Sequence, residues 1–303
     1  MKSQSRWTRT TRAASQQVLR EYSTSFSLAA RILPRAVRDH IAAVYAVVRV
    51  ADEVVDGAFP EATGAQKRDA LLEHEAALAR AVECGFSTDP YLHAFALTAR
   101  ATGIGPEHWG PFYAAMRQDA DPVPHDRESL RTYIHGSAEV VGEMCVLAFF
   151  DGAPLPSDAG LHDRLFRGAR ALGSAFQKVN FLRDLGEDTT QLHRSYFPEA
   201  GAATGADPAG PASDPDAFDD AVKDSLVAEI DAELRLASAA IDLLPPRTRP
   251  AVRAAQSLFT DLNARLARTP ARELLRTRVR VPDPRKLYLT GRALAGRNPF
   301  PAR

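Results

Sequence analysis

The amino-acid sequence predicts an all-α protein that folds as one large helical bundle over residues 1–303. Apolar residues recur at helical spacing along nearly the whole chain, and no convincing run of period-two alternation indicates a strand. The 21 prolines fall mostly between the periodic segments, as expected of residues that end helices. No repeat of fixed period is visible, so stacked structural repeats are not predicted.

The helical pattern is divided among ten segments, with boundaries loose by a few residues. We expect helices near 12–31, 35–57, 64–84, 88–103, 106–120, 127–150, 158–191, 215–243, 247–268 and 283–296. Residues 199–216 are mostly Ala, Gly, Pro and Asp, with Thr204 as the one β-branched residue. Such a composition buries little apolar surface, so this stretch predicts a flexible surface loop rather than a domain boundary.

Composition excludes several classes of protein. Lys+Arg and Asp+Glu both number 38, so the net charge is zero and no nucleic-acid partner is indicated. Mean hydropathy is −0.25, and no apolar run approaches the ~18 residues of a membrane-spanning helix. The two cysteines cannot form a disulfide framework or a CxxC metal site. We therefore expect a cytoplasmic protein.

The first twelve residues include four basic ones, Lys2, Arg6, Arg9 and Arg12, and no acidic ones. Because no apolar segment follows, they do not resemble a secretory signal. We expect a solvated basic arm, with peripheral contact to an anionic membrane surface as the alternative.

An acidic stripe runs along the predicted helix 35–57. Most of this helix is apolar, which is typical of a buried helix. Tyr45, Arg49, Asp52 and Asp56 follow one another at spacings of 4, 3 and 4 residues and therefore share a face, about 100° from the main apolar stripe. Burial of two carboxylates on adjacent turns is costly unless a cation is bound. The alternative is a solvent-facing stripe in which Arg49 pairs with an aspartate.

The predicted helix 158–191 repeats this arrangement. Gln177, Asn180, Asp184 and Asp188 form its polar stripe, and Arg183 lies beside the first aspartate. One DxxxD pattern is common on exposed helices, but two of them on apolar helices favour a shared site. Mg²⁺ prefers carboxylate oxygens and keeps positions open for phosphates. The pair therefore predicts a cavity that binds a diphosphate head and a hydrocarbon tail.

Six segments, in this order, resemble the squalene/phytoene synthase family, and bacterial phytoene synthases most of all. They are YSTSFSLAARILP (22–34), YAVVRVADEVVDG (45–57), YIHGSAEVVGEM (133–144), FQKVNFLRDLGED (176–188), RSYFP (194–198) and RTRVRVPDPRKL (276–287). The resemblance implies an isoprenoid synthase-like helical bundle with a central cavity. It also implies head-to-head condensation of two geranylgeranyl diphosphates, through prephytoene diphosphate, to phytoene in carotenoid biosynthesis. Mg²⁺ or Mn²⁺ is the implied metal, and no NADPH is expected.

The resemblance also assigns roles to individual residues. Asp52, Asp56, Asp184 and Asp188 match the family's metal-binding aspartates, and Asn180 matches its metal-binding asparagine.

Further positions match those that contact the substrate in the family. Those near the diphosphates or the substrate are Ser23, Ser25, Tyr45, Arg49, Gln177, Arg183 and Arg278, and Tyr133 and Tyr196 match tyrosines that line the reaction centre. Tyr133 is also the candidate for cation stabilisation or proton transfer, for which the released diphosphate is the alternative base. Simpler roles remain open: Ser23 or Ser25 as a helix cap, Tyr133 as a core tyrosine and Arg278 as a surface arginine.

Two alternative functions remain open from the sequence. A squalene or dehydrosqualene synthase would use farnesyl diphosphate, and the choice depends on cavity size. A scaffold or assembly protein of the same fold would not need metal ligands, whereas all four aspartates are present. The oligomeric state is not predicted.

Overall fold

The computed structural model describes residues 2–122, 125–190, 218–296 and 299–300, and within these ranges every regular element is a helix. The all-α prediction is therefore confirmed. The elements are α1 (Lys2–Tyr22), α2 (Thr24–Ala30), α3 (Arg35–Asp56), α4 (Gly64–Cys84), α5 (Pro90–Thr102), α6 (Pro106–Asp119), α7 (Arg127–Ile134), the π-helix η1 (His135–Glu139), α8 (Val140–Phe150), α9 (Ala159–Thr190), α11 (Asp220–Ile241), α12 (Arg249–Arg268), α13 (Ala271–Leu274) and α14 (Asp283–Leu294). The loop predicted at 199–216 lies outside the described residues.

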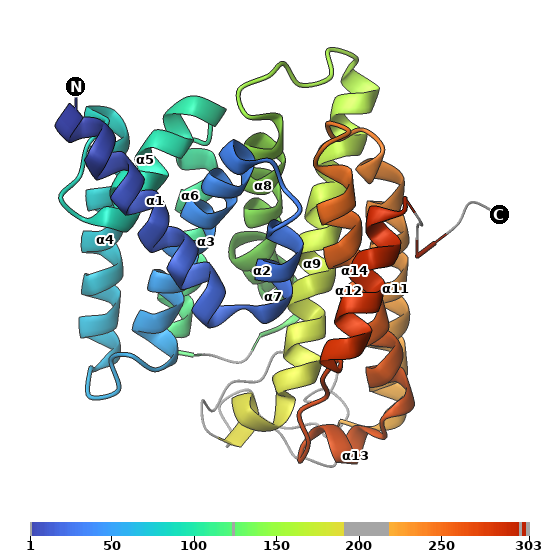
Figure 1. Cartoon of the computed structure of the whole chain (residues 1–303). Helices are drawn as coiled ribbons and strands as arrows, with labels where there is room; N and C mark the ends of the chain where they lie inside the picture. The colour runs from blue at the N-terminus through green and yellow to red at the C-terminus, as the bar shows by residue number, and fades with distance from the viewer. Residues whose placement is uncertain (1, 123–124, 191–217, 297–298, 301–303) are drawn as a thin grey trace.

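The helices form two groups with α2 and α8 between them (Figure 1). In one group α1 packs on α3 and α5, and in the other α9 packs on α11 and α12 packs on α14. One large core cluster joins both groups, because buried residues from α3 to α6 contact others from α9, α11 and α12. The carboxyl ends of α3 and α9 lie at the same end of the bundle (Figure 1). The two acidic stripes are therefore brought to one end of the molecule.

The N-terminal region differs from its prediction. The expected helix 12–31 is two helices, because Ser23 is extended (φ −143°, ψ 106°) and its Oγ accepts a hydrogen bond from Phe26 N at 3.1 Å. The basic arm is the start of α1, and its Arg6 and Arg9 are exposed, but other side chains of this segment pack on the bundle. Its Thr11 is fully buried, and the Trp7 Nε1 group donates to the Ser87 carbonyl at 3.3 Å.

The segment predicted as one helix over 127–150 is continuous but changes its winding at η1. Such π-turns often occur at functional sites. Two glycines let this segment approach α9 closely. A methyl group on Gly142 would lie 2.5 Å from the Ala169 carbonyl oxygen, and one on Gly173 would lie 2.5 Å from that of Ala138. Larger residues would push these helices apart, so the glycines fix the wall from which Tyr133 projects.

Candidate active site

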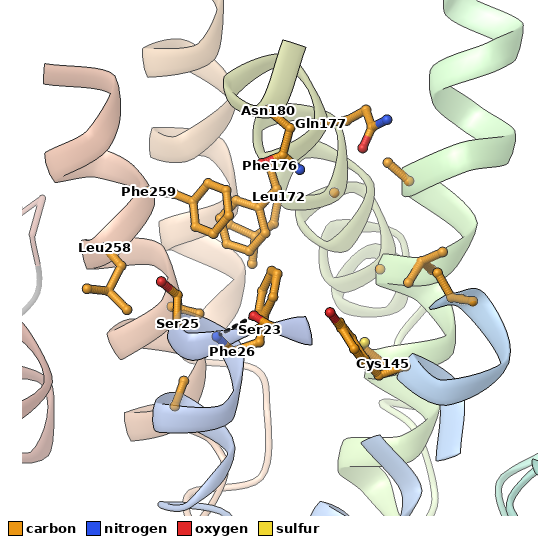
Figure 2. Close-up of a pocket in the computed structure, with 18 of the residues that line it drawn as sticks. Ser23, Ser25, Phe26, Cys145, Leu172, Phe176, Gln177, Asn180, Leu258 and Phe259 are labelled. Carbon is orange, nitrogen blue, oxygen red and sulfur yellow. Dashed lines mark hydrogen bonds between the residues drawn. The ribbon is translucent and has the colours of Figure 1, made fainter. Parts of the chain in front are cut away.

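A cavity of about 1270 Å³ lies between the two groups of helices. Its walls come from α1, α2, α3, α6, α7, η1, α8, α9, α11, α12 and the segment 278–286. Figure 2 shows Ser23, Ser25 and Phe26 on one side and Phe176, Gln177 and Asn180 of α9 on another. Twelve of the fourteen predicted site residues line this cavity: Ser23, Ser25, Tyr45, Arg49, Asp52, Asp56, Tyr133, Gln177, Asn180, Arg183, Asp184 and Arg278.

Two predicted residues cannot be placed in the cavity. Asp188 belongs to α9, but its side chain lies outside the described part of the structure. Tyr196 falls in the range 191–217, which is also outside it. Their assignments remain predictions.

The polar side chains of the α3 stripe face the cavity, and some of them pair with other residues of the same helix. Arg49 Nη1 lies 3.7 Å from Asp52 Oδ2, and Arg49 also forms an ion pair with Glu53. Burial lowers the pKa of Arg49, but the hydrogen bond to Glu53 and the charge of Asp52 outweigh it, so the pKa lies above its usual value. The predicted arginine–aspartate pair therefore exists within the cavity wall rather than on a solvent-facing stripe. Glu53, which the sequence analysis did not select, also lines the cavity.

The stripe of α9 presents a second acidic centre held by two arginines. Arg183 donates to both oxygens of Asp184, with Nε–Oδ1 at 2.9 Å and Nη2–Oδ2 at 2.5 Å. Arg278 Nε lies 2.8 Å from Asp184 Oδ1. Arg278 is therefore placed at the site, and it is not an isolated surface arginine. Two guanidinium cations, which can bind phosphate oxygens, and one carboxylate meet at this point.

The residues present fit a divalent cation by donor type. The carboxylates of Asp52, Asp56 and Asp184 and the amide of Asn180 are the oxygen ligands that Mg²⁺ prefers. Within the described residues, no three His, Cys, Asp or Glu side chains lie close enough together to hold a metal ion. Arginines instead hold Asp52 and Asp184. The bound metal therefore remains a prediction.

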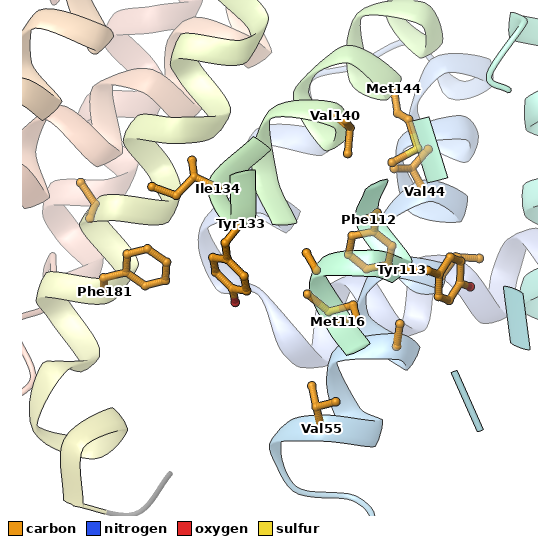
Figure 3. Close-up of a cluster of buried hydrophobic side chains, with 14 of the residues drawn as sticks. Val44, Val55, Phe112, Tyr113, Met116, Tyr133, Ile134, Val140, Met144 and Phe181 are labelled. Carbon is orange, nitrogen blue, oxygen red and sulfur yellow. The ribbon is translucent and has the colours of Figure 1, made fainter. Parts of the chain in front are cut away.

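Tyr133 is paired with an aspartate that the sequence analysis did not select. Its hydroxyl donates a 2.8 Å hydrogen bond to Asp119 Oδ2 at the end of α6. Tyr133 is 2% exposed and Asp119 is 8% exposed, and both line the cavity. Figure 3 shows Tyr133 between Phe181 and Met116, within the main core cluster, so it is also a core tyrosine with a satisfied hydroxyl. Asp119 is not part of a polar stripe along its helix, so the spacing of residues in the sequence does not identify it as a site residue.

Ser23 and Tyr45 form the polar part of the wall near α2. Ser23 caps α2 and also lines the cavity, so both of its predicted roles are compatible. Burial raises the pKa of Tyr45 to about 12, although nearby Arg49 and a hydrogen bond from Ser23 oppose the rise. The Tyr45 hydroxyl therefore stays protonated near neutral pH.

Aromatic rings cover the wall between these polar groups. Phe176 and Phe259 stack with ring centroids 3.7 Å apart, and Phe26 lies 5.7 Å from Phe176 (Figure 2). Phe259 is therefore an apolar wall residue. The cavity thus presents carboxylates and guanidinium groups together with a large aromatic and aliphatic surface.

A sequence model of the squalene/phytoene synthase family matches residues 19–285. The chain belongs to this family. Two curated relatives are a phytoene synthase of Mycobacterium bovis, 28% identical, and a 4,4'-diapophytoene synthase of Staphylococcus haemolyticus, 30% identical. The first match covers 66% of this chain and 63% of the relative, and the second covers 61% of each. The chain therefore spans less than two thirds of the length of these relatives.

Solved structures agree with the squalene/phytoene synthase assignment at the level of the fold. A dehydrosqualene synthase crystallised with a ligand superimposes with a TM-score of 0.76 at 22% identity, covering 95% of this chain and 97% of the other. The predicted isoprenoid synthase-like bundle is therefore confirmed. None of the helices in the described ranges is both long and apolar enough to cross a membrane.

Proposed function

We propose that this member of the squalene/phytoene synthase family joins two molecules of geranylgeranyl diphosphate head to head and converts the product to phytoene. One observation carries the proposal: a single cavity of about 1270 Å³ has aspartates and arginines from α3 and α9 in its wall and apolar side chains over much of the rest. Pockets for single drug-sized ligands measure roughly 300–1,000 Å³. The larger volume supports two long-chain substrates.

In the proposed site, cations hold the diphosphates. Arg49, Arg183 and Arg278 line the cavity beside the acidic groups and supply fixed positive charge for phosphate oxygens. Gln177, Ser23 and Ser25 supply hydrogen bonds from the same wall. Asp52, Asp56, Asn180, Asp184 and Asp188 would hold Mg²⁺ or Mn²⁺, which would neutralise the diphosphate and make it a better leaving group when bound. No NADPH is required for phytoene.

The reaction has two halves that balance without a redox partner. In the first, one substrate loses diphosphate, its allylic cation alkylates the double bond of the other, and loss of a proton closes the cyclopropane of prephytoene diphosphate. In the second, the remaining diphosphate leaves, the carbon skeleton rearranges, and loss of a second proton gives phytoene. The rings of Phe26, Phe176 and Phe259 lie in the cavity wall and would stabilise the cations. The apolar walls exclude the water that would otherwise trap them.

Tyr133 is the proposed side chain for cation stabilisation or proton transfer. Its hydroxyl is oriented by Asp119, so the oxygen lone pairs and the aromatic face have fixed directions. The released diphosphate is the alternative base.

The closest alternative is a squalene or dehydrosqualene synthase that uses farnesyl diphosphate. A relative named 4,4'-diapophytoene synthase and a structural neighbour named dehydrosqualene synthase support this alternative. Purified protein should be incubated with Mg²⁺ and either the C15 or the C20 diphosphate, and substrate consumption measured. Preferential consumption of the C20 substrate is expected, and exclusive consumption of the C15 substrate would overturn the phytoene assignment.

The expected cellular location is the cytoplasm. The hydrocarbon tails of substrate and product favour loose contact with a membrane.

A further inference from the structure

The outward face of α14 is unusually apolar. Its Leu289, Thr290 and Ala293 are buried against the bundle, where α14 packs on α12 and α2. The opposite face exposes Leu287 (63%), Tyr288 (53%) and Leu294 (57%). With Pro284 and Gly291, which are also exposed, these residues follow spacings of three or four and form one continuous stripe. We call these five residues the α14 stripe.

This concentration of exposed apolar side chains occurs on one element. The described part of the chain has six other large exposed apolar residues, and they are spread singly over α1, α4, α9, α11 and two loops: Tyr22, Phe59, Leu72, Phe86, Leu161 and Leu236. Scattered apolar residues are normal on a protein surface, whereas a contiguous stripe marks a binding surface.

Basic residues border the α14 stripe, although Arg285 also pairs with Asp261 and Lys286 with Asp283. Residues 271–296 contain seven basic side chains and only two acidic ones, although the whole chain has no net charge. Arg285 and Arg292 lie over the ring of Tyr288, at 5.2 Å and 5.9 Å from its centroid. An exposed apolar stripe that contains a tyrosine and is bordered by arginines is typical of helices that lie in a membrane interface.

The α14 stripe is continuous with the cavity wall. The segment from Arg278 to Pro282, together with Asp283 and Lys286 in the first turn of α14, lines the cavity. The same short stretch of chain therefore contributes to the catalytic cavity on one side and to the basic apolar surface on the other.

We propose that the α14 stripe docks on the surface of an anionic lipid bilayer. Leu287, Tyr288 and Leu294 would enter the headgroup region. Arg292 would contact lipid phosphates, and so would the amino groups of Arg285 that its 2.8 Å Nε contact with Asp261 leaves available. The charge of the surface favours lipid over a second copy of the chain. A two-fold dimer places the same patch on both subunits, so two basic surfaces would repel each other.

Docking at this place would bring the cavity wall next to the bilayer. In combination with the proposed function, the hydrocarbon tails would then exchange with lipid rather than with water. The docking itself rests on the surface of α14 and does not depend on the identity of the reaction.

Vesicle co-sedimentation of the full chain tests the proposal. Vesicles of phosphatidylcholine mixed with phosphatidylglycerol should bind the wild type, more weakly at high salt, and vesicles of phosphatidylcholine alone should bind it much less. The double variant Leu287→Glu/Leu294→Glu should bind at least roughly tenfold more weakly. Arg292→Glu should also weaken binding while it leaves the apolar residues in place.

A matched control is Leu236→Glu, which places the same substitution at an exposed leucine of α11 (49% exposed). It should bind vesicles like the wild type. Absence of wild-type binding, equal binding to both vesicle types, or an equal loss in the control would overturn the proposal. So would a wild-type dimer in analytical ultracentrifugation that the double variant converts to a monomer.

Turnover separates this proposal from the proposed function. Leu287 and Leu294 are outside the cavity lining. The double variant should therefore retain wild-type activity on detergent-dispersed substrate. If the wild type binds vesicles but has no prenyltransferase activity, only the proposed function fails; if it is active but does not bind, only the docking fails.

Discussion

The Tyr133 hydroxyl donates to Asp119 Oδ2 at 2.8 Å, although the two residues are 14 positions apart and belong to different helices. Both side chains are buried and both line the cavity. This pairing explains how a tyrosine on the apolar wall keeps its hydroxyl satisfied and in one orientation.

Replacement of Asp119 by alanine should lower the turnover number about 10- to 100-fold. A hydrogen bond to a charged group contributes about 1.5–3 kcal/mol, and loss of that orientation at the reaction centre would raise the barrier by a similar amount. The measurement is product formation at saturating substrate for Asp119→Ala, Tyr133→Phe and the double variant. If Asp119 acts through Tyr133, the double variant should be little worse than Tyr133→Phe, whereas fully additive losses would contradict this dependence.

Neutralising the acidic stripes should abolish most activity without unfolding the protein. Asp52→Asn or Asp184→Asn should reduce turnover by orders of magnitude, because each removes a proposed metal ligand and charge from the cavity wall. Helical content should stay near normal in circular dichroism. Asp163→Asn is the matched control, since Asp163 lies on the exposed surface of α9 and pairs with Arg167. Full activity in Asp52→Asn would show that the stripe is structural.

Removal of divalent cations should stop the reaction reversibly. Chelator-treated protein should form no product, and addition of Mg²⁺ or Mn²⁺ should restore it, because diphosphate is a poor leaving group without cations. A direct readout is calorimetric titration of Mg²⁺ into the protein with pyrophosphate, compared with Asp184→Asn. Undiminished turnover in excess chelator would rule out the metal assignment.

The ion pairs between α9 and α11 should determine stability rather than activity. Buried Lys178 donates to Glu229 Oε1 at 2.5 Å and to Glu233 Oε1 at 2.6 Å on α11. Breaking a fully buried pair costs about 3–5 kcal/mol, and Glu233 is partly accessible, so Lys178→Met should lower the unfolding free energy by about 2–3 kcal/mol. Arg167→Met, in an exposed ion pair, should cost less than about 1 kcal/mol.

The loss in Lys178→Met should depend on pH. Burial raises the pKa of Glu233 above its usual value despite the opposing charge of Lys178, and removal of the lysine should raise it further. A carboxyl with a raised folded-state pKa takes up a proton in the folded protein first, so stability increases as the pH falls through that pKa. Denaturant unfolding at neutral and mildly acidic pH should therefore show a smaller loss at the acidic pH. A constant loss would contradict this coupling.

The sequence predicted the parts of the fold that follow helical periodicity. Helices α3 and α9 appear within one residue of their expected bounds, because their apolar stripes are long and are bounded by Pro34 and Gly57 in α3. Their polar stripes line one cavity because both helices end at the same edge of the bundle. Spacing on a helix fixes which side chains share a face, and it was enough for these residues.

Other features depend on individual hydrogen bonds and ion pairs, which helical periodicity does not predict. The break at Ser23 reflects a capping hydrogen bond inside an otherwise periodic stretch, so periodicity alone joined α1 to α2. Asp119 belongs to the site because it contacts Tyr133 of another helix, and spacing within one helix does not predict such a contact. Asp184 has one arginine partner of each kind. Arg183 is adjacent in sequence, whereas Arg278 lies 94 residues further along the chain.

Product analysis by chromatography, with the purified chain, C20 diphosphate and Mg²⁺, is the most direct test of the proposed chemistry. We predict a 40-carbon hydrocarbon that co-elutes with phytoene, together with two diphosphates released for each molecule formed. Formation of only a prenyl alcohol or a cyclised C20 product would mean that the cavity ionises a single substrate, and it would contradict head-to-head condensation.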